Sequence, residues 1–319
     1  MQRRLCRLFP VAAFLSLTLL AIPAHAQGKD LQQHLRDQHK GKILVLRSFY
    51  DGDSLSYDSA GQLSGSAASG DWTIDGMIQV DDVRVSNHRL SIQAKRLHMG
   101  WVHDSGFSPV RCPEGKLGKL CEEKRKLRIE ADLGPGEATA DNAEAMLARI
   151  FVTQEDHFVE LVPDYWMPCV LAAVGDKPLA QYAACQFSPE FLAVPGLAPH
   201  SDSAANADST RPDRPGSERA SSPGLFHIGR GVSPPKVIVQ HEPEFSEPAR
   251  MAKFQGVVTL GLVVDASGLP TNIRILKPLG CGLDEKAVHA VQGWRFKPAE
   301  KDGQPVAAGI AVEVDFHLY

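Results

Sequence analysis

The sequence predicts an α+β fold: a small antiparallel sheet with a packed helix at the C-terminus, a β-rich unit before it, and a polar linker between them. Apolar residues alternate along segments 257–264 and 307–318, as in half-buried strands. Segment 283–291 instead repeats its apolar residues at helical spacing. Segment 193–235 is rich in Pro and Ser, so it cannot bury enough apolar surface to offset the entropy of ordering. These observations divide the chain into units 27–192 and 236–319.

Composition agrees with a globular protein of this size. The 319 residues suggest two domains, at about 150 residues for each. Hydrophobic residues make up 43% of the chain and charged residues 23%, which excludes a collagen-like, wholly disordered or multi-span membrane protein. With 34 basic and 38 acidic residues the net charge is −4, so no basic surplus favours nucleic acid as a partner.

Residues 1–26 have the three parts of an export signal. Arginines at positions 3, 4 and 7 precede an apolar run over 11–22, and Ala24-His25-Ala26 forms a cleavage site. Cleavage there would make Gln27 the first residue and place the protein in the periplasm. The alternative is an uncleaved inner-membrane anchor over 8–26, a stretch near the length of a span but interrupted by Pro and His.

The N-terminal unit, 27–192, reads as a small β or α+β domain. Alternating or β-branched runs predict strands over 43–50, 72–85, 89–97 and 126–133. Asp141 and Glu144 have capping-box spacing and predict a short helix that contains residues 145–150. No family resemblance is evident in this unit, and its role is open.

Five cysteines follow the signal. Proximity in an exported chain makes Cys112–Cys121, which bracket a Gly/Lys-rich loop, and Cys169–Cys185 candidate disulfides, with Cys281 left free. The alternative is a set of buried reduced thiols. Because no C-x-x-C occurs, a redox dithiol or zinc knuckle is not expected.

Candidate catalytic residues in the N-terminal unit are few. His98, His103 and Asp104 invite a metal site, but the spacing of the two histidines suits neither one helix face nor one strand face, so we expect surface residues at a hairpin end. Glu155-Asp156-His157 with Glu160 could hold an acid/base pair, although a solvated face is the simpler interpretation. Segment 122–128 has four basic residues and reads as a solvated edge. No nucleophile, zinc-protease or phosphate-loop motif appears, so we expect neither an enzyme nor a cofactor. The tryptophans Trp72, Trp101 and Trp166 read as packing residues.

The C-terminal unit has the clearest pattern. Strand 257–264 leads through a turn at Asp265–Gly268 into strand 272–277, which is followed by helix 283–291 and a closing strand over 307–318. The expected core residues of this unit are Val258, Leu260, Ile275, Val291, Trp294 and Phe296.

The motifs in Pro243–Tyr319 carry a family resemblance. PEFSEPARMAKFQG, the VDASG hairpin turn, GLDEKAVHAVQGWRFKPAEKDGQPV and the closing AVEVDFHLY occur in an order and spacing that resemble the C-terminal domain of the TonB family. The resemblance implies a non-enzymatic periplasmic protein. It would bind the TonB box, a periplasmic peptide of outer-membrane TonB-dependent transporters, and support energy-dependent transport.

The resemblance also implies how the peptide is held. The box would add as a strand to the edge of the last strand, where unpaired backbone groups capture an extended peptide. The implied contact residues are Glu242 and Phe245 before the first helix, and Ala307, Ala308, Gly309, Ile310, Ala311, Val312, Glu313, Val314, Asp315 and Phe316. Phe245 stands where the family usually has Tyr, and Glu242 where a polar amide contacts the box. Glu313 and Asp315 are also typical of strand edges that resist aggregation.

A departure from the family at the N-terminus keeps alternatives open. The family's energy-transducing members retain an N-terminal helix with Ser and His four residues apart, whereas Ser16 is followed here by Leu20. An inner-membrane proton-driven motor is therefore an expected partner only if the N-terminus is uncleaved. The alternative function is an exported structural or interaction protein that uses the TonB-like module for homodimerisation or envelope binding, without energy transduction. A periplasmic enzyme in the N-terminal unit is a third hypothesis.

Overall fold

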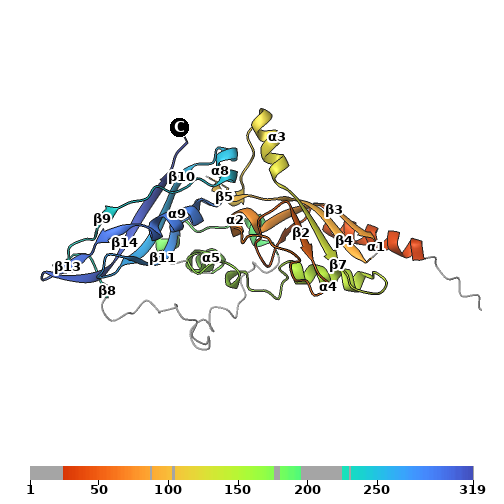
Figure 1. Ribbon diagram of the computed structural model, residues 1–319, viewed down its shortest axis with the longest axis horizontal. Coiled ribbons are helices and arrows are strands. Elements are labelled where there is room, and N and C mark those ends of the chain that lie inside the picture. The colour runs from red at the N-terminus through yellow and green to blue at the C-terminus, as the bar shows by residue number, and fades with distance from the viewer. Residues whose placement is uncertain are drawn as a thin grey trace, which may run out of the picture.

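The computed structural model describes residues 24–86, 88–102, 105–175, 180–194, 225–229 and 231–318 (Figure 1). The expected export signal lies outside these residues except for 24–26, and so does most of the expected linker, at 195–224 and 230. Among the described residues, no helix has the length and apolar character needed to cross a membrane.

A five-stranded sheet forms the body of the N-terminal unit. Its strands, in order across the sheet, are β1 (Ile43–Val45), β3 (Met77–Ser86), β4 (Arg89–Arg96), β7 (Lys126–Asp132) and β2 (Ser54–Tyr57). Neighbouring strands are antiparallel except β7 and β2. Helices α1 (Ala24–His39) and α4 (Ala140–Ile150) pack on the apolar face of this sheet and complete a core.

Strand alternation explains that core. In β4, Leu90, Ile92 and Ala94 are buried while their neighbours are partly exposed, because successive side chains point to opposite faces. The buried residues of α4, among them Met146 and Ile150, lie on one helical stripe and pack in the same cluster.

Some sequence predictions for this unit were wrong. Trp72–Asp75 is a helical turn, α2, and not the start of a strand, because Trp72 inserts into an aromatic cluster and the Asp75 carboxylate accepts a hydrogen bond from the Asp71 N–H. The cap of α4 is formed by Thr139 and Asn142, and not by the expected Asp141 and Glu144. The Thr139 hydroxyl accepts from the Asn142 N–H, and the Asn142 side chain accepts from the Thr139 N–H.

The shorter elements lie between the two sheets or beside them. The expected loop between Cys112 and Cys121 contains a helix, α3 (Gly115–Lys124), and the expected 43–50 strand ends at Val45. The others are β5 (Met99–Val102), β6 (Gly106–Pro109), η1 (Phe158–Glu160), α5 (Met167–Val174), η2 (Ala180–Tyr182) and α6 (Pro189–Leu192).

The C-terminal unit is a second antiparallel sheet with helices. Its strand order is β11 (Pro270–Lys277), β10 (Gly256–Val264), β14 (Gln304–Phe316) and β13 (Ala299–Lys301), and β8 (Leu225–Phe226) pairs with β14 in parallel. A two-stranded ribbon of β9 (Lys236–Val239) and β12 (Arg295–Lys297), with helices α8 (Glu247–Ala252) and α9 (Leu283–Gln292), completes it. The α+β prediction is therefore confirmed, and all six expected core residues of this unit are buried.

The two units share one hydrophobic core. Trp72, Phe107 and Trp166 from the N-terminal unit belong to the same buried cluster as Leu260 and Ile275 from the C-terminal sheet. In Figure 1, α2, β5 and α5 lie between the two sheets, which occupy opposite ends of an elongated molecule. The C-terminal sheet is thus held against its partner by packing as well as by the chain.

Backbone hydrogen bonds join the units as well. The Trp101 N–H donates to the Leu279 carbonyl at 2.9 Å, and the Cys281 N–H donates to the Met99 carbonyl at 2.6 Å. Gly280 lies so close to β5 that a Cβ atom at this position would be 2.4 Å from the Gly100 Cα. Only a glycine permits this approach, which also requires a φ of +90° at Gly280.

Both candidate disulfides are present in the structure. Cys112 is bonded to Cys121, and Cys169 to Cys185. Cys281 is a free, buried cysteine, and burial raises the pKa of its thiol to about 12. A thiol with so high a pKa is a poor nucleophile at neutral pH, which leaves Cys281 a packing role.

Candidate functional site

Strand β14 has one open edge. On one side it pairs with β10 from Ala308 opposite Val264 to Phe316 opposite Gly256. On the other side, β13 pairs only with Gln304–Val306, and β8 only with Ala307 and Ala308. In the part of the chain that the structure describes, no strand pairs with 309–316 on that side.

This arrangement shortens the expected peptide edge. Ala307 and Ala308 already have a strand neighbour in β8, so the unpaired backbone begins at Gly309. β8 is held there by a small cluster in which Phe226 packs with Val232, Ala299 and Ala308. The Lys301 ammonium also lies 4.8 Å from the centre of the Phe226 ring. β8 therefore sets the start of the open edge.

The side chains of the open edge divide between two faces. Val314 and Phe316 are buried, at 2% and 1% exposure, and Ile310 and Val312 are partly buried beside them. Gly309, Ala311, Glu313 and Asp315 alternate with them and are exposed. One face of the edge is thus part of the core, and the other presents two small residues and then two acids to solvent.

The segment before α8 reaches the end of this edge. Phe245 packs edge-to-face against Phe316, with ring centres 5.6 Å apart. Ser246 caps α8 by accepting the Ala249 N–H, and its hydroxyl donates to the Cys281 carbonyl. Glu242, which precedes this anchored turn, is exposed. The structure therefore brings Phe245 to β14 and leaves Glu242 on the adjoining surface.

The opposite edge of the sheet is covered at Ile275 and Leu276. In β11 the Ile275 N–H donates to the Tyr165 carbonyl at 3.0 Å, and the Leu276 carbonyl faces the Cys185 sulfur at 3.7 Å. Both covering residues, Tyr165 and Cys185, belong to the N-terminal unit, and Cys185 is bonded to Cys169, four residues after Tyr165. The sequence did not reveal this contact, because its partners are far apart in the chain.

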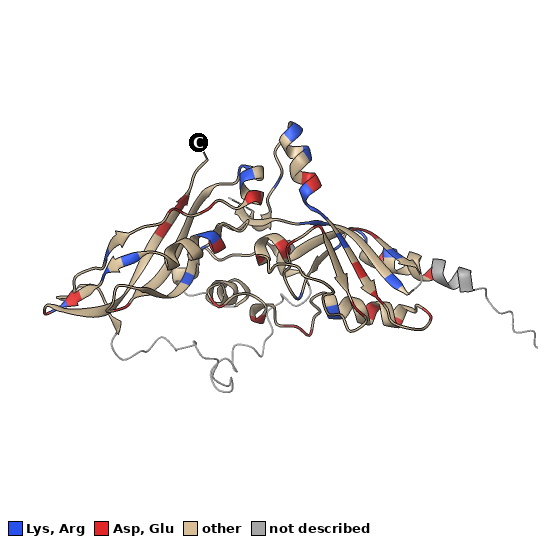
Figure 2. Ribbon diagram, in the orientation of Figure 1, with Lys and Arg blue, Asp and Glu red and all other residues tan. Residues whose placement is uncertain are grey.

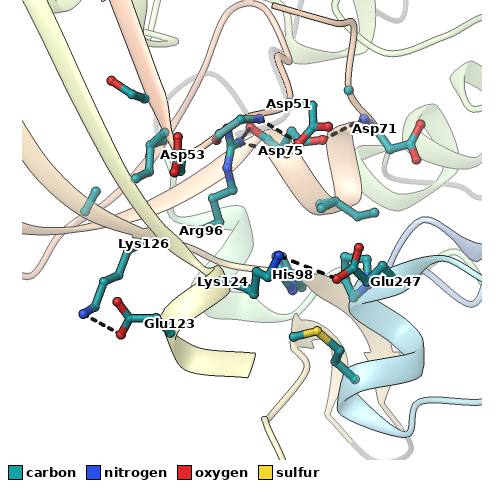
Figure 3. A pocket seen from close by; sticks show the side chains of 18 of the residues that line it. Asp51, Asp53, Asp71, Asp75, Arg96, His98, Glu123, Lys124, Lys126 and Glu247 are labelled. Carbon is teal, nitrogen blue, oxygen red and sulfur yellow. Dashed lines mark hydrogen bonds and ion pairs between the residues drawn. The ribbon is translucent and has the colours of Figure 1, made fainter. Parts of the chain in front are cut away.

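A cleft of about 1230 Å³ lies between the two units (Figure 3). Asp71, Asp75, Arg96 and His98 line it from the N-terminal unit, and α8 and Lys286 line it from the C-terminal unit. Arg96 is buried and forms an ion pair with Asp75 at 3.0 Å. Burial, partly offset by Arg96, raises the pKa of Asp75 to about 6.

Of the candidate catalytic residues, the structure buries His98 and pairs Asp156 with an arginine. The expectation that His98 is a surface residue was wrong: it is 5% exposed, and burial, with Arg125 and Arg96 nearby, lowers its pKa to about 3. His103 and Asp104 lie outside the described residues.

Asp156 accepts from the Thr153 N–H and pairs with Arg47 at 2.6 Å, so it stabilises a local turn. Arg125 in the basic run is also buried, not solvated. Among the described residues, no cluster of His, Cys, Asp and Glu has the arrangement of a metal site.

The geometry defines a class of protein: an α+β domain whose small antiparallel sheet has an unpaired strand edge at 309–316. Comparison with known families confirms the resemblance for this part of the chain. Residues 241–318 match the family model described as the Gram-negative bacterial TonB protein C-terminal, so this segment is a domain of the TonB C-terminal family.

Two curated relatives agree. The chain is 30% identical over 107 residues to "Protein TonB" of Vibrio cholerae, a match that covers 33% of this chain and 44% of the relative. It is 36% identical over 77 residues to "Protein tonB2" of Pseudomonas aeruginosa, covering 24% and 28%. The chain thus spans less than half the length of either. A solution NMR structure of the P. aeruginosa TonB C-terminal domain aligns over 30% of this chain and 93% of its own, at 20% identity and a TM-score of 0.24.

Proposed function

We propose that this chain is a periplasmic binding protein that captures the TonB box of outer-membrane transporters by strand addition at Gly309–Phe316, and so supports energy-dependent transport. The observation that carries the proposal is the open edge of β14 in a segment that matches the TonB C-terminal family. An edge of unpaired N–H and C=O groups binds an extended peptide through main-chain hydrogen bonds.

The membrane partners depend on the N-terminus. If residues 1–26 are removed, the protein is a periplasmic binder, and force must come from another subunit. If they are retained as an anchor, a proton-driven inner-membrane motor becomes a direct partner. The intact mass of the protein from its native envelope fraction separates the two cases, because only the first begins at Gln27.

Peptides with N-methylated amides test strand addition. Only every second residue of an added strand directs its hydrogen-bonding groups at the acceptor edge. One TonB-box peptide would be methylated at alternate amides, and a second at the amides between them. With the full chain we expect one to lose binding and the other to keep it, and amide NMR shifts to gather at 309–316. Equal binding of both peptides, or no binding at millimolar concentration, would overturn the proposal.

The alternative, self-association through the module, uses the same edge. A second copy on β14 would make the sedimentation coefficient rise with protein concentration and would reduce peptide binding in the same range. A concentration-independent monomer that binds the peptide excludes this alternative for the edge.

A further inference from the structure

The open edge of β14 is negatively charged. From Gly303 to Tyr319 the sequence has two acids, Glu313 and Asp315, and neither Lys nor Arg. Both acids are exposed and lie on the same face, where Figure 2 shows acidic positions toward the end of the strand near the C-terminus. The exposed face of the open edge therefore has a net negative charge next to the position that a bound strand would take.

The neighbouring strand does not neutralise these acids. Across the β10–β14 pairing, Glu313 lies opposite Thr259, and Asp315 lies opposite Val257. Asp315 contacts His317, which is its neighbour on the same exposed face. Because directly opposite side chains are the closest neighbours in a sheet, a strand added on the unpaired side of β14 would place its own side chains next to both acids.

Acidic residues also precede Phe245, which contacts the end of β14. Phe245 packs on the buried face of β14 at Phe316, and the residues before it include exposed Glu242 and Glu244. Glu244 is only loosely paired: the Lys286 ammonium is 3.4 Å away, and the Glu244 side chain is 84% exposed. These two acids add negative charge to the exposed segment that leads to Phe245.

We infer that the strand captured by β14 is a peptide with basic side chains at two alternating positions, which face Glu313 and Asp315. This inference rests on the proposed function and adds the charge of the partner to it. Opposite charges across a strand pair favour pairing, and like charges disfavour it. The main-chain hydrogen bonds provide binding to any extended peptide, and the two acids select among peptides by charge.

Fluorescence anisotropy with the full chain tests the inference. The probes are three labelled extended peptides, about as long as Gly309–Phe316, on one Val/Thr frame with Lys, Gln or Glu at two alternating positions. We expect the Lys peptide to bind about threefold to tenfold more tightly than the Gln peptide, and the Glu peptide to bind more weakly by a similar factor. Added salt should reduce the difference, because the acids are exposed.

A charge-reversed variant gives the decisive comparison. The double substitution Glu313→Lys/Asp315→Lys changes exposed side chains and should invert the order, so that the Glu peptide binds best. Glu137→Lys/Glu155→Lys is the matched control, because it changes net charge equally at exposed positions of the N-terminal unit and should keep the original order.

The outcomes separate the two proposals. If all three peptides bind equally, or the order survives charge reversal at positions 313 and 315, the charge inference is wrong while strand addition stands. If no peptide binds at millimolar concentration, both are wrong. A control variant that also inverts the order would show that the net charge of the protein, and not the edge, selects the peptide, which again overturns the inference.

Discussion

The Trp166 indole nitrogen donates a hydrogen bond to Oε1 of Glu285 at 2.8 Å, across the junction between the two units. Trp166 is fully buried, and the second carboxylate oxygen of Glu285 is buried without a hydrogen-bond partner among the described residues. Burial, together with Asp71 and Asp284, raises the pKa of Glu285 well above its usual range. Burial likewise raises the pKa of Asp284 to about 7. Burial at this junction therefore favours the protonated form of Glu285.

This relationship predicts how stability depends on pH. A carboxyl whose folded pKa is raised binds its proton more tightly in the folded state, so its stabilisation is lost as pH rises through the folded pKa. Glu285→Gln removes one such group, and we expect its free energy of unfolding to fall less than that of the wild type as pH rises above about 4.5, the ordinary pKa of this carboxyl group. Chemical denaturation at several pH values measures this.

Trp166→Phe provides the comparison for that variant. It leaves Glu285 in place without its donor, which should cost about 1–3 kcal/mol throughout this range. Parallel pH profiles for Glu285→Gln and the wild type would contradict the assignment of the raised pKa.

His98 predicts the opposite dependence at lower pH. Its folded pKa is lowered to about 3 from 6.5 by burial, so the unfolded chain binds the proton more readily. Stability is then lost as pH falls below 6.5, by at most about 1.4 kcal/mol for each pH unit. We expect His98→Gln to flatten this loss between pH 6 and 4 in denaturant titrations. An unchanged slope would show that other groups carry the acid sensitivity.

Gly280 predicts a large packing effect. In Gly280→Ala the new methyl group would meet the Gly100 Cα at 2.4 Å and the Met99 carbonyl oxygen at 2.6 Å. We expect a loss of about 3 kcal/mol or more, because backbone on both sides must move. Gly303→Ala is the control, since its φ of +78° is similar but nothing lies within 4 Å of the added atom. Equal losses of stability in the two variants would mean that φ alone is responsible.

The Cys169–Cys185 disulfide predicts a local effect on β11. The Cys169→Ala/Cys185→Ala variant should lose about 2–4 kcal/mol of stability, because the unfolded chain gains freedom. It should also speed hydrogen exchange at the Ile275 amide, whose acceptor is the Tyr165 carbonyl. Cys112→Ala/Cys121→Ala removes a bond in another segment and should leave that amide protected. Equal exchange rates in the two variants would exclude a role for the disulfide in covering β11.

Local sequence patterns predicted the C-terminal unit well. The alternation of Val258, Leu260 and their neighbours gave the β10 hairpin, and the stripe from Leu283 to Val291 gave α9, because each pattern matches the period of its element. The candidate edge followed from the resemblance, but its limit at Gly309 did not. That limit depends on β8, a two-residue strand that comes from the far end of the expected linker.

Local sequence patterns did not predict the contacts at the junction between the two units. Trp72 and Trp166 read as packing residues, yet nothing in their neighbourhoods identifies a helical turn at Trp72 or Glu285 as the partner of Trp166. The prediction that His98 lies at the surface was wrong for the same reason, since its burial results from strands and helices that meet only in three dimensions. Contacts between residues more than 100 positions apart leave no periodic trace in the sequence.

The contact between Tyr165 and Ile275 limits how the β11 edge can take part in assembly. Polymers that grow by edge-to-edge addition need two complementary acceptor edges on each monomer, one for each direction of growth. Here the Tyr165 carbonyl occupies the β11 edge at Ile275, and among the described residues no strand pairs with 309–316 on the open side of β14. Growth through both edges of the sheet would have to displace the Tyr165 contact at Ile275, whereas a strand added at 309–316 displaces no strand that the structure describes.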